Sequence, residues 1–250
     1  DAGVLVINGD DAELIEATSA FTGTRVTVGT SQKNDLWVSN VRCTIEGTYF
    51  RVEPIGMDAF VPLLGEHSAV NALYAIAVAR VMGLDDEQTI GHLRKASGPE
   101  MRLQLVDAGG IRILNDAYNA NPASMRAAIR TLASLPTKGR RIAVVGDMRE
   151  LGVASGECHR EIGKFIGGQF APDLLVCVGA EAMAIAAEAM RNGMRADRIE
   201  HFTNASAATA ISARLMDGDL VLLKASRAIG LEIVAREIVA SRRPPLAAAS

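Results

Sequence analysis

Several side chains that form hydrogen bonds crowd one short connection, NDAYNANP at residues 115–122, between an apolar run and a predicted helix. An aspartate such as Asp116 at the end of a strand can accept both hydroxyls of a ribose, and the start of the following helix favours anions. The same stretch also has an explanation without a ligand, because Asp and Asn side chains form local turns and Asn121 before Pro122 suits a helix start. The residue types alone leave both interpretations open.

Two further connections, GDMRELG and KASRAIGLE, also hold more polar side chains than a turn requires. In the first, Asp147 and Glu150 could contact a ligand or could be solvated loop acids. In the second, Ser226 is well placed to cap the next helix. Arg227 is harder to explain in this way, because a planar two-pronged donor near a helix start is suited to holding a carboxylate. We therefore count both connections as candidate ligand-binding loops.

The remaining reactive side chains form no recognisable catalytic or metal-binding pattern. Cys43, Cys158 and Cys177 are too few and too scattered for a disulfide framework or a CxxC metal site, so we expect reduced structural thiols. His67 and Asn71 lie four residues apart on one face at the start of a helix, but one histidine without a second ligand nearby is more often structural. The sequence contains no GxxxxGK[ST] phosphate loop. We predict no metal site within this chain.

The composition is that of a globular protein without a bias toward nucleic acids or membranes. The chain has 250 residues, of which 49% are hydrophobic, and a net charge of −3 without a block of like charges. No apolar run is long enough to cross a bilayer, and no signal peptide opens the chain. We therefore expect a cytoplasmic α/β protein of one large or two ordinary domains. Because a buried-looking strand at residues 4–7 opens the sequence abruptly, we also expect a preceding part of a larger protein.

Alternation of apolar and polar residues predicts strands over most of residues 1–62. One short helix is predicted near residues 12–20, with Asp10 or Asp11 as its cap. The stretches RVTVGT, LWVSNVRCTI and TYFRVEPI have the period and the Gly-centred turns of antiparallel strands. This part of the chain is therefore predicted to contain a sheet with short connections.

Two predicted helices complete the first region, one that stops at Gly83 and one over about residues 85–96. The Gly and Pro of SGPEMR then break the helical pattern. We place a domain boundary there, which gives domains at residues 1–99 and 100–243 and a disordered tail at residues 244–250.

After this boundary a hairpin, LQLVD–AGG–IRILND, leads into alternating strands and helices. Strands are predicted at 111–115, 141–146, 174–178, 199–202 and 220–224, and helices at 122–134, 156–167, 180–192, 205–215 and 229–240. Such alternation predicts a Rossmann-like, mostly parallel, doubly wound sheet. Ligands bind such sheets beyond the carboxyl ends of the strands, and all three candidate loops follow predicted strands.

Five stretches, in order, resemble segments of the Mur ligase family. They are LLGEHSAVNALYAIAVA, MRLQ, NDAYNANPASMRAAI, RIAVVGDMRELG with HREIG, and LVLLKASRAIGLE. The YNANP and GDMRELG stretches are most similar to the member that adds D-alanyl-D-alanine to UDP-N-acetylmuramoyl-tripeptide in peptidoglycan synthesis. The resemblance implies the last part of a central ATPase domain, with a mixed sheet plus helices, followed by the whole C-terminal ligase domain.

The resemblance also implies roles for individual residues. Asp116 matches the residue that holds the ATP ribose, Asn71 matches one at the adenine end, and Arg102 matches a linker arginine that reaches the phosphates. The implied ATP contacts are Asn71, Arg102, Asp116, Tyr118 and Asn121, with Arg102 as the catalytic residue. The implied contacts of the incoming dipeptide are Asp147, Met148, Glu150, Ser226 and Arg227.

The chain departs from the family pattern at several positions. Met101 replaces a glycine beside Arg102, Ser68 replaces an asparagine, and Ala225 and Ala228 stand where glycine is common. An alanine at a position with positive φ would be strained, so the shape of the substrate loop could differ. The phosphate loop, the magnesium-binding glutamate and histidine and the carbamoylated lysine typical of the family are all expected upstream of this chain.

The implied function is ATP-dependent amide bond formation through an acyl phosphate. ATP and Mg²⁺ are the implied cofactors, and UDP-N-acetylmuramoyl-tripeptide and D-alanyl-D-alanine are the implied substrates of a monomeric enzyme without nucleic-acid or membrane partners. Taken alone, this chain is expected to be inactive. Two alternatives remain open: a non-catalytic nucleotide- or peptide-binding module, and a Mur-type ligase that uses another amine.

Overall fold

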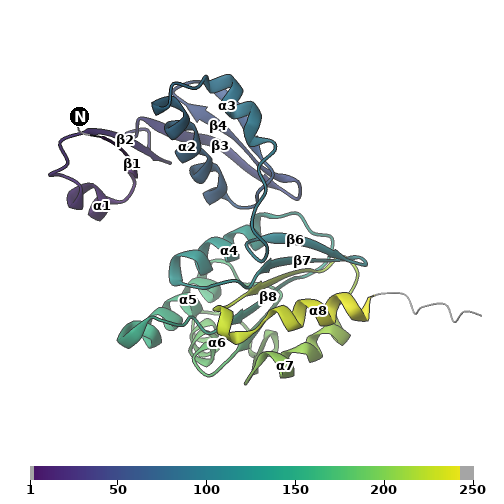
Figure 1. Cartoon of the computed structure of the whole chain (residues 1–250). Coiled ribbons are helices and arrows are strands. Elements are labelled where there is room, and N and C mark those ends of the chain that lie inside the picture. Colours follow the sequence, from purple (N-terminus) through teal and green to yellow (C-terminus); the bar gives the residue numbers. More distant parts are fainter. Residues whose placement is uncertain (1–2, 243–250) are drawn as a thin grey trace, which may run out of the picture. The chain divides into compact units, whose positions relative to one another are not determined.

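The chain forms two compact units, each with its own sheet and core. The computed structural model describes residues 3–242, which divide between unit 1, Asp1–Gly98, and unit 2, Pro99–Ser250 (Figure 1). This division falls one residue before the predicted boundary. The tail predicted at 244–250 lies outside the described residues.

Unit 1 is built on a five-stranded mixed sheet in the order β1-β2-β3-β4-β5. Its strands are β1 (Val4–Asn8), β2 (Thr24–Gly29), β3 (Leu36–Thr44), β4 (Gly47–Glu53) and β5 (Met57–Val61). The pairs β3–β4 and β4–β5 are antiparallel. β2 is parallel to both of its neighbours, so the antiparallel prediction for RVTVGT is wrong. The reason is that α1 (Ala12–Ala17) carries the chain across between β1 and β2, and such a crossover joins parallel strands.

Two longer helices pack on this sheet. α2 (Glu66–Val81) contacts β2, β3 and β4, and α3 (Asp86–Leu93) contacts β5 and α2. α2 buries Ala69, Leu73 and Ile76 at the predicted helical spacing. The Asp11 and Asp85 carboxylates cap α1 and α3 by accepting hydrogen bonds from backbone N–H groups, and both helices end before their predicted limits.

Unit 2 contains a six-stranded sheet in the order β10-β9-β8-β11-β7-β6. Its strands are β6 (Gln104–Ala108), β7 (Ile111–Asp116), β8 (Arg141–Gly146), β9 (Leu174–Val178), β10 (Ile199–Phe202) and β11 (Leu220–Lys224). All neighbouring pairs are parallel except β6–β7, which is the predicted antiparallel hairpin. The predicted mostly parallel, doubly wound sheet is therefore confirmed.

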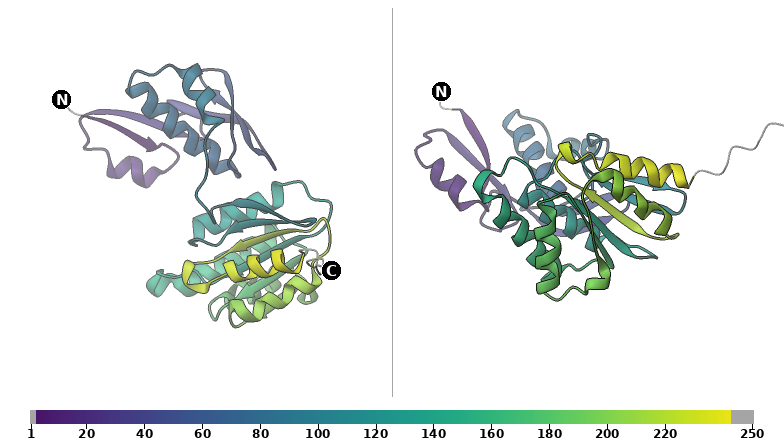
Figure 2. Two further views of the ribbon diagram at one scale, coloured as in Figure 1. Left: turned by 45° about the vertical axis from the view of Figure 1, so that its right-hand side comes forward. Right: turned by 90° about the horizontal axis from the view of Figure 1, so that it is seen from below.

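Helices cover both faces of this sheet (Figure 2). α4 (Pro122–Ser134), α5 (Ser155–Gln169) and α6 (Ala182–Arg191) form one layer, in which α5 contacts both of the others. α7 (Ala205–Ala208), the 3₁₀ helix η3 (Thr209–Arg214) and α8 (Glu232–Ser241) form the other layer. β8, β9 and β11 are almost wholly buried, as expected of parallel strands covered on both sides.

Two predicted helices of unit 2 differ in form. The helix expected at 205–215 is a single α-turn followed by η3, and its buried residues Ala205, Ala208 and Ile211 recur every three residues, which is the period of a 3₁₀ helix. The helix expected from residue 229 begins at Glu232. It is preceded by the 3₁₀ turn η4 (Arg227–Ile229) and by Gly230 at φ 74°, a left-handed conformation that interrupts a helix.

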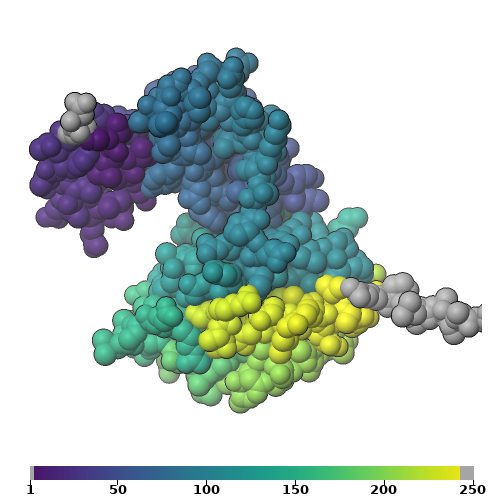
Figure 3. All heavy atoms as spheres, viewed as in Figure 1, coloured from purple at the N-terminus to yellow at the C-terminus, as the bar shows by residue number. Residues whose placement is uncertain are grey.

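α8 lies on the surface of unit 2, as the yellow segment of the space-filling view shows (Figure 3). It buries Val234 and Ile238, while Arg236 and Glu237 are exposed. Within residues 3–242, none of the helices has the length and apolarity required to span a bilayer.

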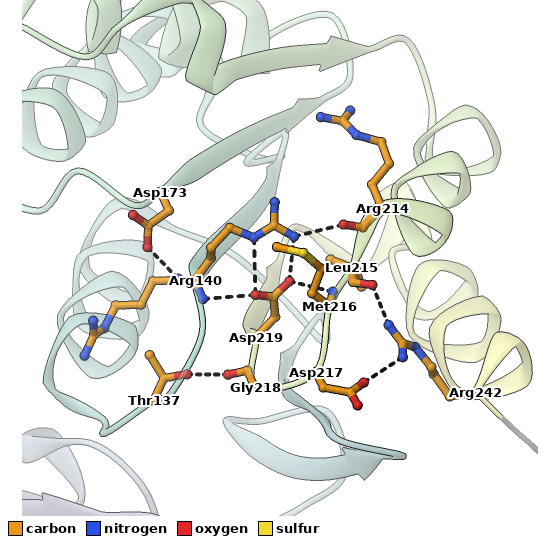
Figure 4. A network of polar contacts seen from close by, with 11 residues as sticks. Thr137, Arg140, Asp173, Arg214, Leu215, Met216, Asp217, Gly218, Asp219 and Arg242 are labelled. Carbon is orange, nitrogen blue, oxygen red and sulfur yellow. Dashed lines mark hydrogen bonds and ion pairs between the residues drawn. The ribbon is translucent and has the colours of Figure 1, made fainter.

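A polar network joins the amino ends of β8 and β11 (Figure 4). The Asp219 carboxylate accepts hydrogen bonds from Arg140 Nη2 at 2.7 Å, from Arg140 N at 3.0 Å and from Met216 N at 2.9 Å. Burial alone raises the pKa of Asp219, but these bonds and the charge of Arg140 outweigh burial and hold the pKa below its ordinary value. Nearby, Arg242 pairs with Asp217 at 2.8 Å. The network therefore connects β8 and β11 at their amino ends, opposite to the candidate loops.

Candidate functional site

The carboxyl ends of three adjacent strands, β7, β11 and β8, bring the candidate loops of unit 2 together. In the sheet register Lys224 of β11 lies beside Asp116 of β7 and Val145 of β8. The chain leaves β7 and β8 toward the layer of α4 and α5, and it leaves β11 toward α8 in the other layer. The connections therefore diverge around the end of β11, which is the position where open α/β sheets bind ligands.

A buried ion pair joins the carboxyl ends of β11 and β7. Lys224 Nζ is 2.8 Å from Asp116 Oδ2 and donates a hydrogen bond of 2.6 Å to the Asn119 carbonyl. The two charged residues are only 2% and 8% exposed. Burial lowers the pKa of Lys224, the charge of Asp116 and its hydrogen bond offset part of this effect, and the positive charge of Arg102 adds to it.

The segment before β6 is attached to the loop after β7. Leu103 N donates to Asp116 Oδ1 at 3.2 Å, and Tyr118 N donates to the Met101 carbonyl at 3.2 Å. The guanidinium of Arg102 lies 4.7 Å from the centre of the Tyr118 ring, and both side chains are exposed. The structure thus brings together three of the residues predicted to contact ATP.

Asn121, a fourth predicted ATP contact, caps α4. Its Oδ1 accepts a hydrogen bond from Ser124 N at 2.8 Å, while Ser124 Oγ accepts one from Asn121 N at 3.1 Å. With Pro122 as the first helical residue, the helix-start interpretation of this dipeptide is confirmed. A contact between Asn121 and ATP stays a prediction.

Ser226 connects the three candidate loops. Its N–H donates to the Asp147 carbonyl at 3.1 Å, and its hydroxyl accepts from Arg149 N at 2.8 Å and donates to the Ala120 carbonyl at 3.4 Å. The hydroxyl makes no capping bond to the turn that follows, so the predicted N-cap role is wrong. The reason is that two backbone groups from distant loops lie within reach of it.

Asp147 and Met148 have fully buried side chains. Asp147 Oδ1 accepts a hydrogen bond from Ala182 N at 2.8 Å, at the first residue of α6. Its Oδ2 is 3.1 Å from Arg149 Nη2, but this contact lacks hydrogen-bond geometry, and no hydrogen-bond partner is found among the described residues. Gly179 permits the packing, since a Cβ there would lie 2.4 Å from Asp147 Oδ1. In this conformation neither side chain is accessible to a ligand.

A buried histidine holds the same loop in place. His159 of α5 is 0% exposed, and its Nε2 accepts a hydrogen bond from Met148 N at 2.9 Å. Its Nδ1 lies 2.7 Å from the Ser155 carbonyl, an acceptor to which a protonated Nδ1 can donate. Glu150 is exposed and has φ 65°. His159 therefore has a structural role in holding this loop.

Arg227 is exposed, and its Nη1 lies 2.9 Å from Met101 Sδ. Met101 has φ 59°, a left-handed conformation that favours glycine. Ala225 and Ala228 do not have positive φ, so the strain anticipated at these alanines is absent. Leu103, at φ 47°, and Glu150 share this left-handed conformation with Met101.

Asn71 belongs to unit 1, where it is exposed on α2 one turn after the exposed His67. The opposite side of the helix buries Ala69, Leu73 and Ile76. Among residues 3–242, no group of three or more His, Cys, Asp or Glu side chains is placed to hold a metal ion. The three cysteines are unpaired, and burial raises the pKa of Cys177 well above its ordinary value.

Comparison with known proteins agrees with this architecture. The family model described as Mur ligase, glutamate ligase domain, matches residues 101–227, and the Mur ligase middle domain matches residues 1–79. This chain belongs to the Mur ligase family. The division into a middle and a C-terminal Mur ligase domain accounts for the two sheets, and the three candidate loops fall in the C-terminal domain.

Several relatives of this Mur ligase chain carry one name. It is 36% identical over 96% of its length to UDP-N-acetylmuramoyl-tripeptide–D-alanyl-D-alanine ligase of Bacillus subtilis, and 30% identical over 94% to that of Escherichia coli. A crystal structure of MurF from Acinetobacter baumannii has a TM-score of 0.81 and 25% identity, covering 96% of this chain and 52% of that one. The chain also spans 52% of both curated relatives, about half their length.

The sequence interpretation overlooked Lys224. It follows the apolar run LVLL in a strand covered on both faces, where a charged residue needs a partner. A lysine directly after four apolar residues is therefore the sequence feature that could have identified it. Its partner could not be identified, because the order β8-β11-β7 is not evident from local patterns.

Proposed function

We propose that this Mur ligase chain acts in ATP-dependent addition of D-alanyl-D-alanine to UDP-N-acetylmuramoyl-tripeptide, in peptidoglycan synthesis. The observation that carries the proposal is the convergence of three loops at the carboxyl ends of β7, β8 and β11, with Asp116 anchored among them. The names of the curated relatives support this choice of substrates.

In the proposed reaction the γ-phosphoryl group of ATP passes to the carboxylate of the tripeptide, and ADP leaves. The amine of the dipeptide then attacks the acyl phosphate, inorganic phosphate leaves, and an amide bond forms. We assign Asp116 to the ribose hydroxyls and Arg102 to the phosphates, where a fixed positive charge offsets the spread of negative charge during transfer. Asn71, Tyr118 and Asn121 remain proposed contacts of ATP. A Mur ligase from Thermotoga maritima that shares this fold was solved in complex with ADP.

The loops after β8 and β11 are the proposed site of the incoming dipeptide. Arg227 is exposed and carries the planar pair of donors that suits a carboxylate, and Glu150 is exposed on the neighbouring loop. Ser226 holds the two loops together, so its proposed role is to keep them in register. Asp147 and Met148 would contribute through their backbone. Positioning an amine beside an activated carboxyl group can lower a barrier by about 7–11 kcal/mol in favourable cases.

Mg²⁺ is part of the proposal as the counterion of ATP. Because the described residues include no cluster suited to a metal ion, we assign no Mg²⁺ ligand within residues 3–242. The proposal also places the protein in the cytoplasm as a monomer.

The test is a ligase assay on the complete protein with ATP, Mg²⁺ and UDP-N-acetylmuramoyl-tripeptide. A panel of amines should include D-alanyl-D-alanine, glutamate and lysine, and ADP release and the ligated product should be measured together. We expect product with the dipeptide, and a loss of at least about 100-fold in kcat/KM for Arg102→Ala, the order observed when a transition-state donor is removed. Preference for a single amino acid would point to a different amine. Nucleotide binding without any product would point to a binding module.

A further inference from the structure

One charged residue of the site has no role in the proposed reaction. Lys224 ends a strand whose other residues, Leu220 to Leu223, are all apolar and buried. Its ammonium reaches two acceptors: the carboxylate of Asp116, the last residue of β7, at 2.8 Å, and the Asn119 carbonyl in the loop that follows, at 2.6 Å. Lys224 therefore connects β11 with the loop that carries the proposed ATP contacts.

The two oxygens of Asp116 are held from different directions. Oδ1 accepts a hydrogen bond from Leu103 N, and Oδ2 lies against Lys224 Nζ. A carboxylate held at both oxygens cannot rotate about its terminal bond without breaking one of these contacts. Leu103 and Lys224 therefore both restrain the direction in which Asp116 presents its acceptors.

Stability alone is a poor explanation for this lysine. Buried ion pairs cost desolvation energy, and their replacement by apolar residues of similar volume is often neutral or stabilising. An apolar residue at position 224 would also continue the run LVLL. A role in orienting the Asp116 carboxylate explains the position of Lys224 better.

We infer that Lys224 is a positioning residue, which orients the Asp116 carboxylate and the loop through Asn119 so that Asp116 can accept the hydroxyls of a nucleotide ribose. This inference rests on the proposed function, because the ribose role of Asp116 belongs to that proposal. Lys224 itself does not touch the nucleotide. It acts through Asp116.

The test compares the affinity of the complete protein for ATP and for 2′,3′-dideoxy-ATP, which lacks the hydroxyls. Hydrogen bonds to a charged acceptor predict that the wild type prefers ATP by on the order of tenfold. In Lys224→Met, which keeps an unbranched side chain, one atom shorter, and removes the charge, this ratio should fall to within about twofold of unity, while affinity for the dideoxy nucleotide changes little. Lys164→Met, at an exposed position of α5, is the control and should keep the wild-type ratio. A lysine with only a structural role would weaken both nucleotides equally and leave the ratio unchanged.

A folded Lys224→Met protein that keeps the full preference for ATP would overturn the inference and leave the proposed function intact. A wild type that binds neither nucleotide would instead remove the proposed function, and the inference with it. If Lys224→Met does not fold, the wild type labelled with ¹⁵N at lysine Nζ provides a second measurement, with Lys224→Arg used to assign the signal. The Lys224 ammonium signal should shift on addition of ATP and stay in place with the dideoxy nucleotide. Equal shifts with both nucleotides, or none with ATP, would also overturn the inference.

Discussion

Met101 shows how one side chain can occupy a position whose backbone suits glycine. Its φ of 59° is uncommon for a residue with a Cβ, and its sulfur contacts Arg227, a proposed substrate contact. The methionine therefore combines an unfavourable backbone conformation with side-chain contacts. These two effects oppose each other in any direct comparison with glycine.

The backbone effect can be isolated by comparing two small replacements. We expect Met101→Gly to be more stable than Met101→Ala by about 1 kcal/mol, because both remove the sulfur contact and only alanine keeps the cost of positive φ. Urea unfolding of the two variants measures the difference. Equal stabilities would mean that the left-handed conformation at residue 101 costs nothing.

At the scale of elements, the carboxyl ends and the amino ends of the strands in the unit 2 sheet carry different features. The carboxyl ends of β7, β8 and β11 carry the exposed polar loops, whereas the amino ends of β8 and β11 are joined by the Asp219 network. Asp219 is 1% exposed and bonds to both the side chain and the backbone of Arg140. We therefore expect this carboxylate to contribute to stability as an anion.

The pKa of Asp219 is lowered in the folded protein, so its contribution should be complete above the unfolded value near 3.8 and should disappear as the pH falls below that value. Asp219→Asn is expected to lose about 2 kcal/mol at pH 7 and much less near pH 2.5. Asp217→Asn is the matched control, since Asp217 is 78% exposed and pairs with Arg242 at the surface, where such pairs contribute about 0–1 kcal/mol. Unfolding measured at several pH values checks this. A loss for Asp219→Asn that does not depend on pH would contradict it.

At the scale of the whole molecule, the chain carries a middle and a C-terminal Mur ligase domain. The sequence has no GxxxxGK[ST] loop, and residues 3–242 hold no cluster suited to a metal ion. The chain covers about half the length of its curated relatives.

We expect the 250-residue chain by itself to bind ATP weakly and to release no ADP above background. Phosphoryl transfer depends on positioning the phosphates and neutralising their charge, and Arg102 alone supplies only part of this. Isothermal calorimetry and a phosphate-release assay, run beside the complete protein, measure both properties. Metal-dependent turnover by the isolated chain would show that its residues suffice.

Much of the architecture follows from the sequence by itself. The limits of β8, β9, β11 and α4 agree with the sequence pattern. The apolar runs within these strands and the Asn-Pro start of the helix are signals that adjacent residues carry by themselves. The candidate loops were also identifiable, because polar residues after apolar strands are conspicuous. The parallel pairing of β2 and the 3₁₀ form of η3 were missed, since both depend on packing with other elements.

Only the tertiary structure decided which groups meet. Lys224 bonds to the carbonyl of Asn119, 105 residues away in sequence, and the Ser226 hydroxyl serves two distant loops instead of its own turn. Both outcomes require β11 to lie between β7 and β8. Local periodicity indicates where a strand begins and ends, but the order of the strands is a property of the whole sheet, and that order brings Lys224 and Ser226 to their partners.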